Sequence, residues 1–224
     1  MIKFEVKKSD LSIEGYFAAP AFNLFRADSN VLNVVTAGLT SLCPIRGADI
    51  RIDQETNPIG NANLSFELHP FNGFARISID RSQIVLFSPH SLDTDLISRL
   101  SSSFFGAINE LLPPNSYAHH VVQFTLHAAL ENISPADHTR RFISPASEGA
   151  DSLIGNAVTY YFGQHGPRLH SSITLDMSGE FSDCVLLRVA MGFDASMVSV
   201  AGLKDAVVEH GNSLFALVDL EADW

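Results

Sequence analysis

The sequence predicts an α+β fold in which antiparallel sheets are covered by long helices, arranged as two similar halves. Segments of alternating apolar and polar residues, separated by turn-forming residues, are typical of β-hairpins with one solvated face. Longer segments whose apolar residues recur every three or four positions are typical of amphipathic helices. A hairpin followed by such a helix occurs at 64–111 and again at 173–218, and this recurrence predicts the two halves.

The N-terminal half, residues 1–131, holds most of the predicted elements. Its first strand alternates Ile2, Phe4 and Val6 with charged residues, and its first helix ends before Pro44, because proline cannot continue a helix. In chain order, the predicted elements are strands at 2–6 and 11–16 around a turn at 8–10, a helix at 30–42, a short strand at 50–52, a loop at 54–63, a hairpin with strands at 64–68 and 75–79, and a strand at 84–87.

The clearest helix of the chain follows this hairpin. Ser91 or Asp93 can cap its N-terminus, and Pro113 and Pro114 end it. A long strand is then predicted at 117–130, where the even-numbered positions from 122 to 128 are apolar. The inward face of the helix is formed by apolar residues at helical spacing, which are Leu96, Leu100, Phe104, Ala107, Ile108 and Leu111.

Residues 132–151 are predicted to be a linker, because they are rich in proline, serine and alanine. The C-terminal half is then residues 152–224, and we expect it to pack with the first half into one compact unit. Its predicted elements are strands at 157–162, 169–177 and 185–193, and a helix at 203–218.

The recurrence can be tested residue by residue. The strand at 64–68 matches 173–177 at an offset of 109, and the helix residues Leu96 and Leu100 match Leu203 and Val207 at an offset of 107. The helix at 30–42 has no counterpart after residue 132. The pattern therefore predicts a duplication of the hairpin and helix, without strict symmetry of the whole chain.

Composition points to a cytoplasmic interaction protein. Hydrophobic residues make up 46% of the chain and charged residues only 17%, which favours a surface buried against a second copy or a protein partner. The net charge of −11 disfavours binding to nucleic acid or to anionic membranes. The chain has no apolar run long enough to span a bilayer and no signal-peptide core at its N-terminus.

No motif in the sequence predicts catalysis, a cofactor or a metal. The two cysteines, Cys43 and Cys184, are expected to be buried thiols. His119 and His120 are adjacent on one predicted strand and point to opposite faces, so they cannot share a metal ion. We therefore expect a non-enzymatic protein that forms homo-oligomers or binds a protein partner.

Two alternatives remain open from the sequence. His138, Arg140 and Arg141 form a basic cluster in an acidic chain, and paired arginines can hold a phosphate or carboxylate. With His138 titrating near neutral pH, this loop predicts a sensor or enzyme that binds a small anion or nucleotide. The 16 phenylalanines also allow an apolar cavity between sheet and helices, as in a carrier of apolar small molecules.

The C-terminal run LKDAVVEHGNSLFALV resembles the closing helix of an uncharacterised bacterial family of two-half α+β proteins. In that family a His and a Phe also lie five residues apart, as His210 and Phe215 do here. The order of hairpin, helix and long strand over 62–130 is similar too. The family's central strand carries an Arg-Tyr pair, which the matching stretch VQFTLHAALENI lacks. The resemblance implies the architecture and no particular activity.

Overall fold

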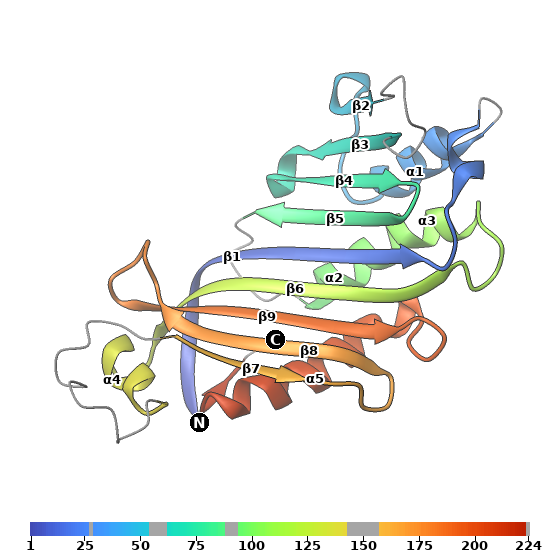
Figure 1. Ribbon diagram of the computed structural model, residues 1–224. Helices are drawn as coiled ribbons and strands as arrows, with labels where there is room; N and C mark the ends of the chain where they lie inside the picture. Colours follow the sequence, from blue (N-terminus) through green and yellow to red (C-terminus); the bar gives the residue numbers. More distant parts are fainter. Residues whose placement is uncertain (27–28, 54–61, 88–93, 143–156, 223–224) are drawn as a thin grey trace.

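The computed structural model describes residues 1–26, 29–53, 62–87, 94–142 and 157–222. In these residues the strands form one ten-stranded sheet, which is antiparallel except where β10 pairs with β1 (Figure 1). The order across the sheet is β2-β3-β4-β5-β1-β6-β9-β8-β7. The prediction of an α+β protein with antiparallel strands is confirmed, but the strands form a single sheet rather than separate ones.

The secondary-structure elements follow the predicted order closely. The strands are β1 (Ile2–Phe17), β2 (Ile50–Asp53), β3 (Asn63–Leu68), β4 (Gly73–Ser78), β5 (Arg81–Phe87), β6 (Tyr117–Leu130), β7 (Val158–Phe162), β8 (Arg168–Met177), β9 (Cys184–Asp194) and β10 (Leu220–Glu221). The helices are α1 (Val31–Thr40), α2 (Thr94–Leu100), the π-helical turn η5 (Ser101–Phe105), α3 (Gly106–Asn109), α4 (Pro135–Arg140) and α5 (Leu203–Leu217), with short 3-10 turns η1 (Phe22–Phe25), η2 (Gly47–Asp49), η4 (His69–Phe71) and η7 (Val200–Gly202).

The pairing of β1 with β6 explains why there is only one sheet. The two strands pair from Phe4 with Leu130 to Phe17 with Tyr117. On its other edge β1 pairs with β5, and β6 pairs with β9. The strands that precede residue 100 are therefore joined edge to edge with those that follow residue 150.

The predicted turn at 8–10 is wrong, because β1 runs unbroken through it. The pairing with β6 shifts register between Val6 and Lys8, which is the position of a β-bulge. A bulge adds one residue to a strand and bends it without ending it. Figure 1 shows the resulting bend of β1, whose first residues pair with β10.

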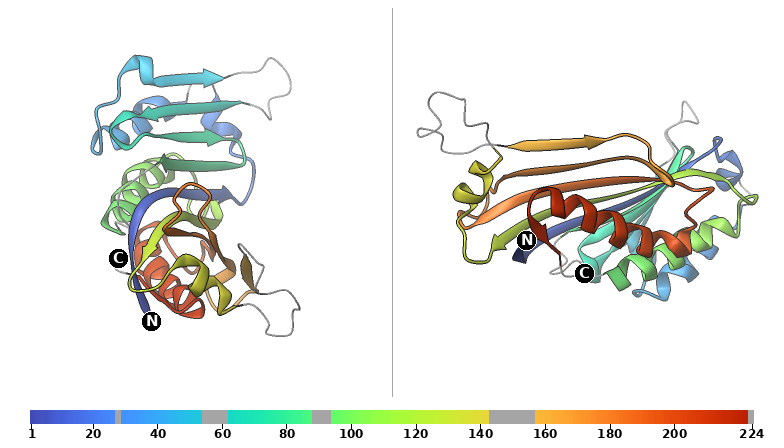
Figure 2. Two further views of the ribbon diagram at one scale, coloured as in Figure 1. Left: turned by 90° about the vertical axis from the view of Figure 1, so that its left-hand side faces the viewer. Right: turned by 90° about the horizontal axis from the view of Figure 1, so that it is seen from below.

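One face of the sheet carries the hydrophobic core. Figure 2 shows α1, α2, α3 and α5 on the same side of the sheet, with α4 at one end. On β1, Leu11 and Ile13 point to the helix side and are buried, while Ser12 points to the opposite face. The opposite face has no helix over it among the described residues. The largest fully buried side chains of the core include Phe66, Phe104, Phe105, Phe193 and Phe215.

The helix predicted from residue 91 onward is present but is not uniform. It begins as α2, passes through the π-helical turn η5 and ends as α3. The predicted caps Ser91 and Asp93 lie outside the described residues. Gly38 of α1 packs against η5 so closely that a Cβ there would overlap the Ser103 carbonyl oxygen. The backbone of α1 at Gly38 is thus in direct contact with the backbone of the π-helical turn η5.

The segment predicted as a linker, 132–151, contains the short helix α4 near its start. The Ser134 hydroxyl accepts a hydrogen bond from the Asp137 backbone N–H at 3.1 Å, and Pro135 occupies the first turn. A serine cap and a proline in the first turn are both strong local signals for a helix start. Residues 143–151 lie outside the described part of the chain.

His119 and His120 point to opposite faces of β6, as predicted. His120 is 2% exposed on the helix side, where its ring lies 5.2 Å from Tyr117 and 6.3 Å from Phe105 between centroids. Burial lowers the pKa of His120 to about 4. Both cysteines are free and buried, also as predicted.

We expect Gly38→Ala to lower the free energy of unfolding by about 1–3 kcal/mol, because its Cβ also comes within 2.9 Å of Ala107 Cβ. Gly106→Ala is the matched control, since a Cβ there meets nothing within 4 Å. In a helix that exchange raises stability by up to about 1 kcal/mol. Urea unfolding of both variants measures the contrast, and equal effects would contradict the close packing of α1.

We expect His120 to make the protein less stable in mild acid. Its pKa is lower in the folded chain than in the unfolded chain, so the unfolded state takes up the proton first as pH falls below about 6.5. Between about pH 7.5 and about pH 5 this removes about 2 kcal/mol of stability. Urea unfolding at both pH values should show a smaller loss for His120→Gln, and an equal loss in both proteins would contradict this.

Candidate functional site

The face of the sheet opposite the helices carries exposed aromatic rings, several arginines and a hollow. Directly paired residues on neighbouring strands share a face. On β1, the side chains of Asp10, Ser12, Glu14 and Tyr16 point away from the core, so the residues paired with them on β5 do so too. We call this the uncovered face.

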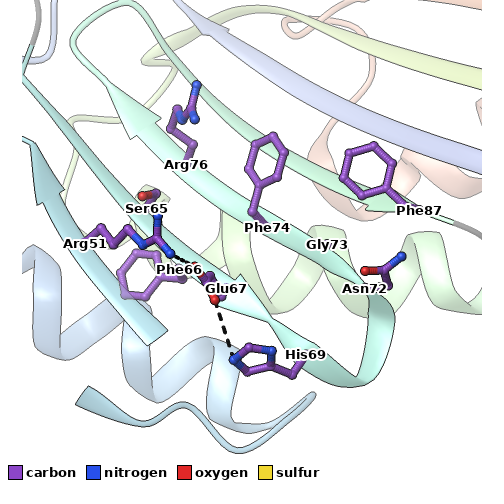
Figure 3. Close-up of a pocket in the computed structure, with 10 residues that line it drawn as sticks. All are labelled: Arg51, Ser65, Phe66, Glu67, His69, Asn72, Gly73, Phe74, Arg76 and Phe87. Atoms are coloured by element: carbon purple, nitrogen blue, oxygen red, sulfur yellow. Dashed lines mark hydrogen bonds and ion pairs between the residues drawn. The ribbon is translucent and has the colours of Figure 1, made fainter. Parts of the chain in front are cut away.

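A hollow of about 350 Å³ lies on the uncovered face over β2 to β5 (Figure 3). Two phenyl rings form one side of it, with 6.3 Å between the centroids of Phe74 and Phe87. Phe87 is 41% exposed. The guanidinium of Arg76 lies over the Phe74 ring at 5.1 Å from its centroid, which is the geometry of a cation–π contact.

The other side of the hollow is polar. Arg51 of β2 forms an ion pair with Glu67 of β3, and His69 Nε2 lies 3.6 Å from the same Glu67 carboxylate. The His69 ring also contacts Asp49 Oδ1 at 3.0 Å. The backbone N–H of Arg46 donates to Asp49 and lowers the pKa of that carboxyl. Arg76, in contrast, has no carboxylate partner among the described residues.

A polar network on β1 and β5 continues the surface beyond the hollow. Arg76 of β4 pairs in register with Gln83 of β5, which pairs with Glu14 of β1. Glu14 is only 7% exposed. Its carboxylate accepts hydrogen bonds from Tyr16 Oη at 2.6 Å, Gln83 Nε2 at 2.9 Å and an Arg81 guanidinium nitrogen at 3.2 Å. The network keeps Glu14 satisfied while holding Tyr16 and Arg81 in place.

The far end of this network reaches β6. The Tyr16 and His119 rings stack with 4.5 Å between centroids and 14° between planes. Burial, followed by the nearby His170, lowers the pKa of His119, and Asp194 opposes the shift. Burial and the contact with Glu14 raise the pKa of Tyr16, so its phenol stays protonated. The groups are thus held in place by hydrogen bonds and by the stacked rings.

In the structure, the three residues of the predicted anion-binding loop each make a different contact within the chain. His138 is fully buried, and its Nε2 lies 2.9 Å from the Val218 carbonyl oxygen. Burial lowers its pKa, so the titration near neutral pH that the sequence predicts is not favoured. Arg141 pairs with Asp219 at 2.9 Å, and Arg140 lies 3.7 Å from Asp137. The contacts of His138 and Arg141 join α4 to the residues that follow α5, whereas the Arg140 contact lies within α4.

The sequence alone does not reveal the hollow, although the alternation of β4 and β5 contains a signal for it. Phe74 precedes the buried Ala75, and Phe87 follows the buried Leu86, so both rings occupy positions where a solvated strand carries polar residues. Arginines occupy similar positions at 51, 76 and 81. What the sequence could not show is the pairing of β2, β3, β4 and β5 that brings these residues together.

Comparisons with known proteins add no evidence on the function of this site. A scan against models of protein families and a search of curated proteins both find no match. The resemblance to the uncharacterised bacterial family therefore stays a prediction. Among the described residues, no cluster of His, Cys, Asp and Glu could hold a metal ion, and no helix has the length and apolar character needed to cross a bilayer.

We expect Glu14→Ala to lower the free energy of unfolding by about 1–3 kcal/mol, because it leaves three donors in the network without their acceptor. Glu67→Ala is the control, since the Arg51–Glu67 pair is exposed and such pairs contribute about 1 kcal/mol or less. Thermal or urea unfolding compares the two variants. A loss for Glu14→Ala no greater than that for Glu67→Ala would contradict a structural role for the network.

Proposed function

We propose that this chain is a non-enzymatic interaction protein that associates with a second copy of itself through the uncovered face of its sheet. The observation that carries the proposal is the pair of rings, Phe74 and Phe87, beside the Arg76 guanidinium, which has no carboxylate partner among the described residues. Aromatic residues and arginine are the residues most enriched at the centres of protein interfaces. The low fraction of charged residues in the chain, 17%, agrees with such a surface.

The distribution of charge on this face favours a second copy as the occupant. Two copies of a chain with a net charge of −11 repel one another wherever their acidic surfaces meet. On the uncovered face of β1 to β5, charges of both signs are interspersed, so this repulsion is small there. A two-fold arrangement can then oppose unlike charges across the interface. The charged residues of this face include Arg51, Arg76 and Arg81 as well as Asp10, Glu14 and Glu67.

The two alternatives from the sequence have less to support them. His138 is fully buried with its Nε2 against the Val218 carbonyl oxygen, and Arg141 is paired with Asp219, so neither group is presented to a shared anion site. For an apolar carrier, the layer between sheet and helices is filled by side chains that include Phe66, Phe104 and Phe105. The hollow over β2 to β5 thus remains the best-supported site of interaction.

Sedimentation of the purified chain at micromolar concentrations tests the proposal. We expect the wild type to sediment as a dimer and the Phe74→Ser, Phe87→Ser variant as a monomer. Phe22→Ser is the matched control, because Phe22 is also exposed, at 52%, but lies on η1. It should leave the dimer intact. A monomeric wild type, or a dimer that survives the double substitution with its fold unchanged, would contradict the proposal.

We further propose that the chain arose by duplication, because strands at equal distances from the β1–β6 junction occur in the same chain order. On one side are β5, β4 and β3, and on the other are β9, β8 and β7. Each set is followed in the chain by a helix. Under this proposal β4 and β5 correspond to β8 and β9, which is one strand later than the match found in the sequence.

A further inference from the structure

A second cluster of basic side chains lies on the helix side of the sheet, away from the hollow. Arg168 begins β8 and pairs in register with Phe193 of β9. Phe193 is buried on the helix side, so the Arg168 side chain leaves the sheet toward the helices as well. Helix α5 packs over β8 and β9 on that side (Figure 2).

The guanidinium of Arg168 packs on an aromatic ring, and one of its N–H groups has no hydrogen-bond partner among the described residues. Its central carbon lies over the Phe162 ring, 5.6 Å from the centroid. Its Nε is buried and has no hydrogen-bond partner among the described residues. It also forms no ion pair with any described carboxylate. A buried, unsatisfied N–H of a charged group costs free energy, so the structure favours an acceptor at this point.

Two histidines lie near this guanidinium. The His210 ring of α5 stacks on Phe193 with 5.6 Å between centroids and 27° between planes. His165 is placed by a tight turn in which its N–H donates to the Arg168 carbonyl oxygen at 2.8 Å, with Gly166 at a φ of +58°. Burial is the main cause that lowers the pKa of His210, and the charges of Arg168 and His165 add to it, while Glu209 opposes them. Phe193 is thus both the strand partner of Arg168 and the stacking partner of His210, and the turn holds His165 three residues before Arg168.

We propose that Arg168, His165 and His210 form a binding site for the phosphate group of a small molecule. The planar guanidinium offers N–H donors that match the oxygens of a phosphate, and the imidazoles can donate from either side. A phosphate has more acceptor oxygens than a carboxylate, so it suits a site that combines a guanidinium with the N–H donors of two imidazoles. The Phe162 and Phe193 rings fix the orientation of the guanidinium and of the His210 ring.

Titration of the full chain with inorganic phosphate, followed by calorimetry or by phosphorus NMR, tests this site. We expect saturable binding to the wild type, and binding weaker by about tenfold or more in Arg168→Gln. Arg188→Gln is the matched control, because Arg188 is exposed on the opposite face of β9 and should not alter binding. Acetate should compete poorly with phosphate.

Each other outcome would overturn the proposal. The site would be excluded if the wild type showed no saturable phosphate binding, or if Arg168→Gln bound phosphate as well as the wild type does. Strong competition by acetate would exclude its preference for a phosphate. If Arg168→Gln fails to fold, the variant His165→Ala, His210→Gln takes its place and should bind phosphate several-fold more weakly. Unchanged binding by that variant would likewise exclude the site. The result is independent of whether the chain dimerises.

Discussion

The pairing of β1 with β6 is the interaction on which the rest of the structure depends. Each strand presents one apolar row to the helices, as in the buried pairs of Leu11 with Phe124 and Ile13 with Val122. Each also offers its second edge to a strand of its own part of the chain. Without this pair the helices would face two small sheets, each with an open edge. With it, one continuous sheet supports one continuous core.

The same arrangement leaves the opposite face of the sheet without a helix over it among the described residues, and the hollow over β2 to β5 lies on that face. On β1, β4 and β5 the outward positions carry Tyr16, Phe74 and Phe87 with the polar network of Glu14 and Arg81. A strand that solvates one face normally carries polar residues there. Phe74 and Phe87 lie at such positions, which supports the proposal that this face binds a second copy of the chain.

Local patterns predict the elements, but pairing between distant segments determines the candidate sites. The strand at 117–130 and the closing helix at 203–217 follow from alternation and helical spacing alone. The bulge after Val6 resembles a turn in the sequence, because a bulge is defined by its partner strand rather than by its own residues. Likewise His138 has the pattern of a surface base, although Val218, 80 residues later, supplies its acceptor. Contacts of this kind have no signal in a single sequence.

Native-state hydrogen exchange tests the central role of the β1–β6 pair most directly. The amides of Leu11–Gly15 and His120–Phe124 should be among the slowest to exchange. The free energy of the opening that exposes them should equal the free energy of global unfolding. The amides of β4 on one side and of β8 on the other should become exposed in the same event. If either set of strands kept its protection after the β1–β6 amides had exchanged, the two parts of the sheet would be separate units, and the central role of this strand pair would be contradicted.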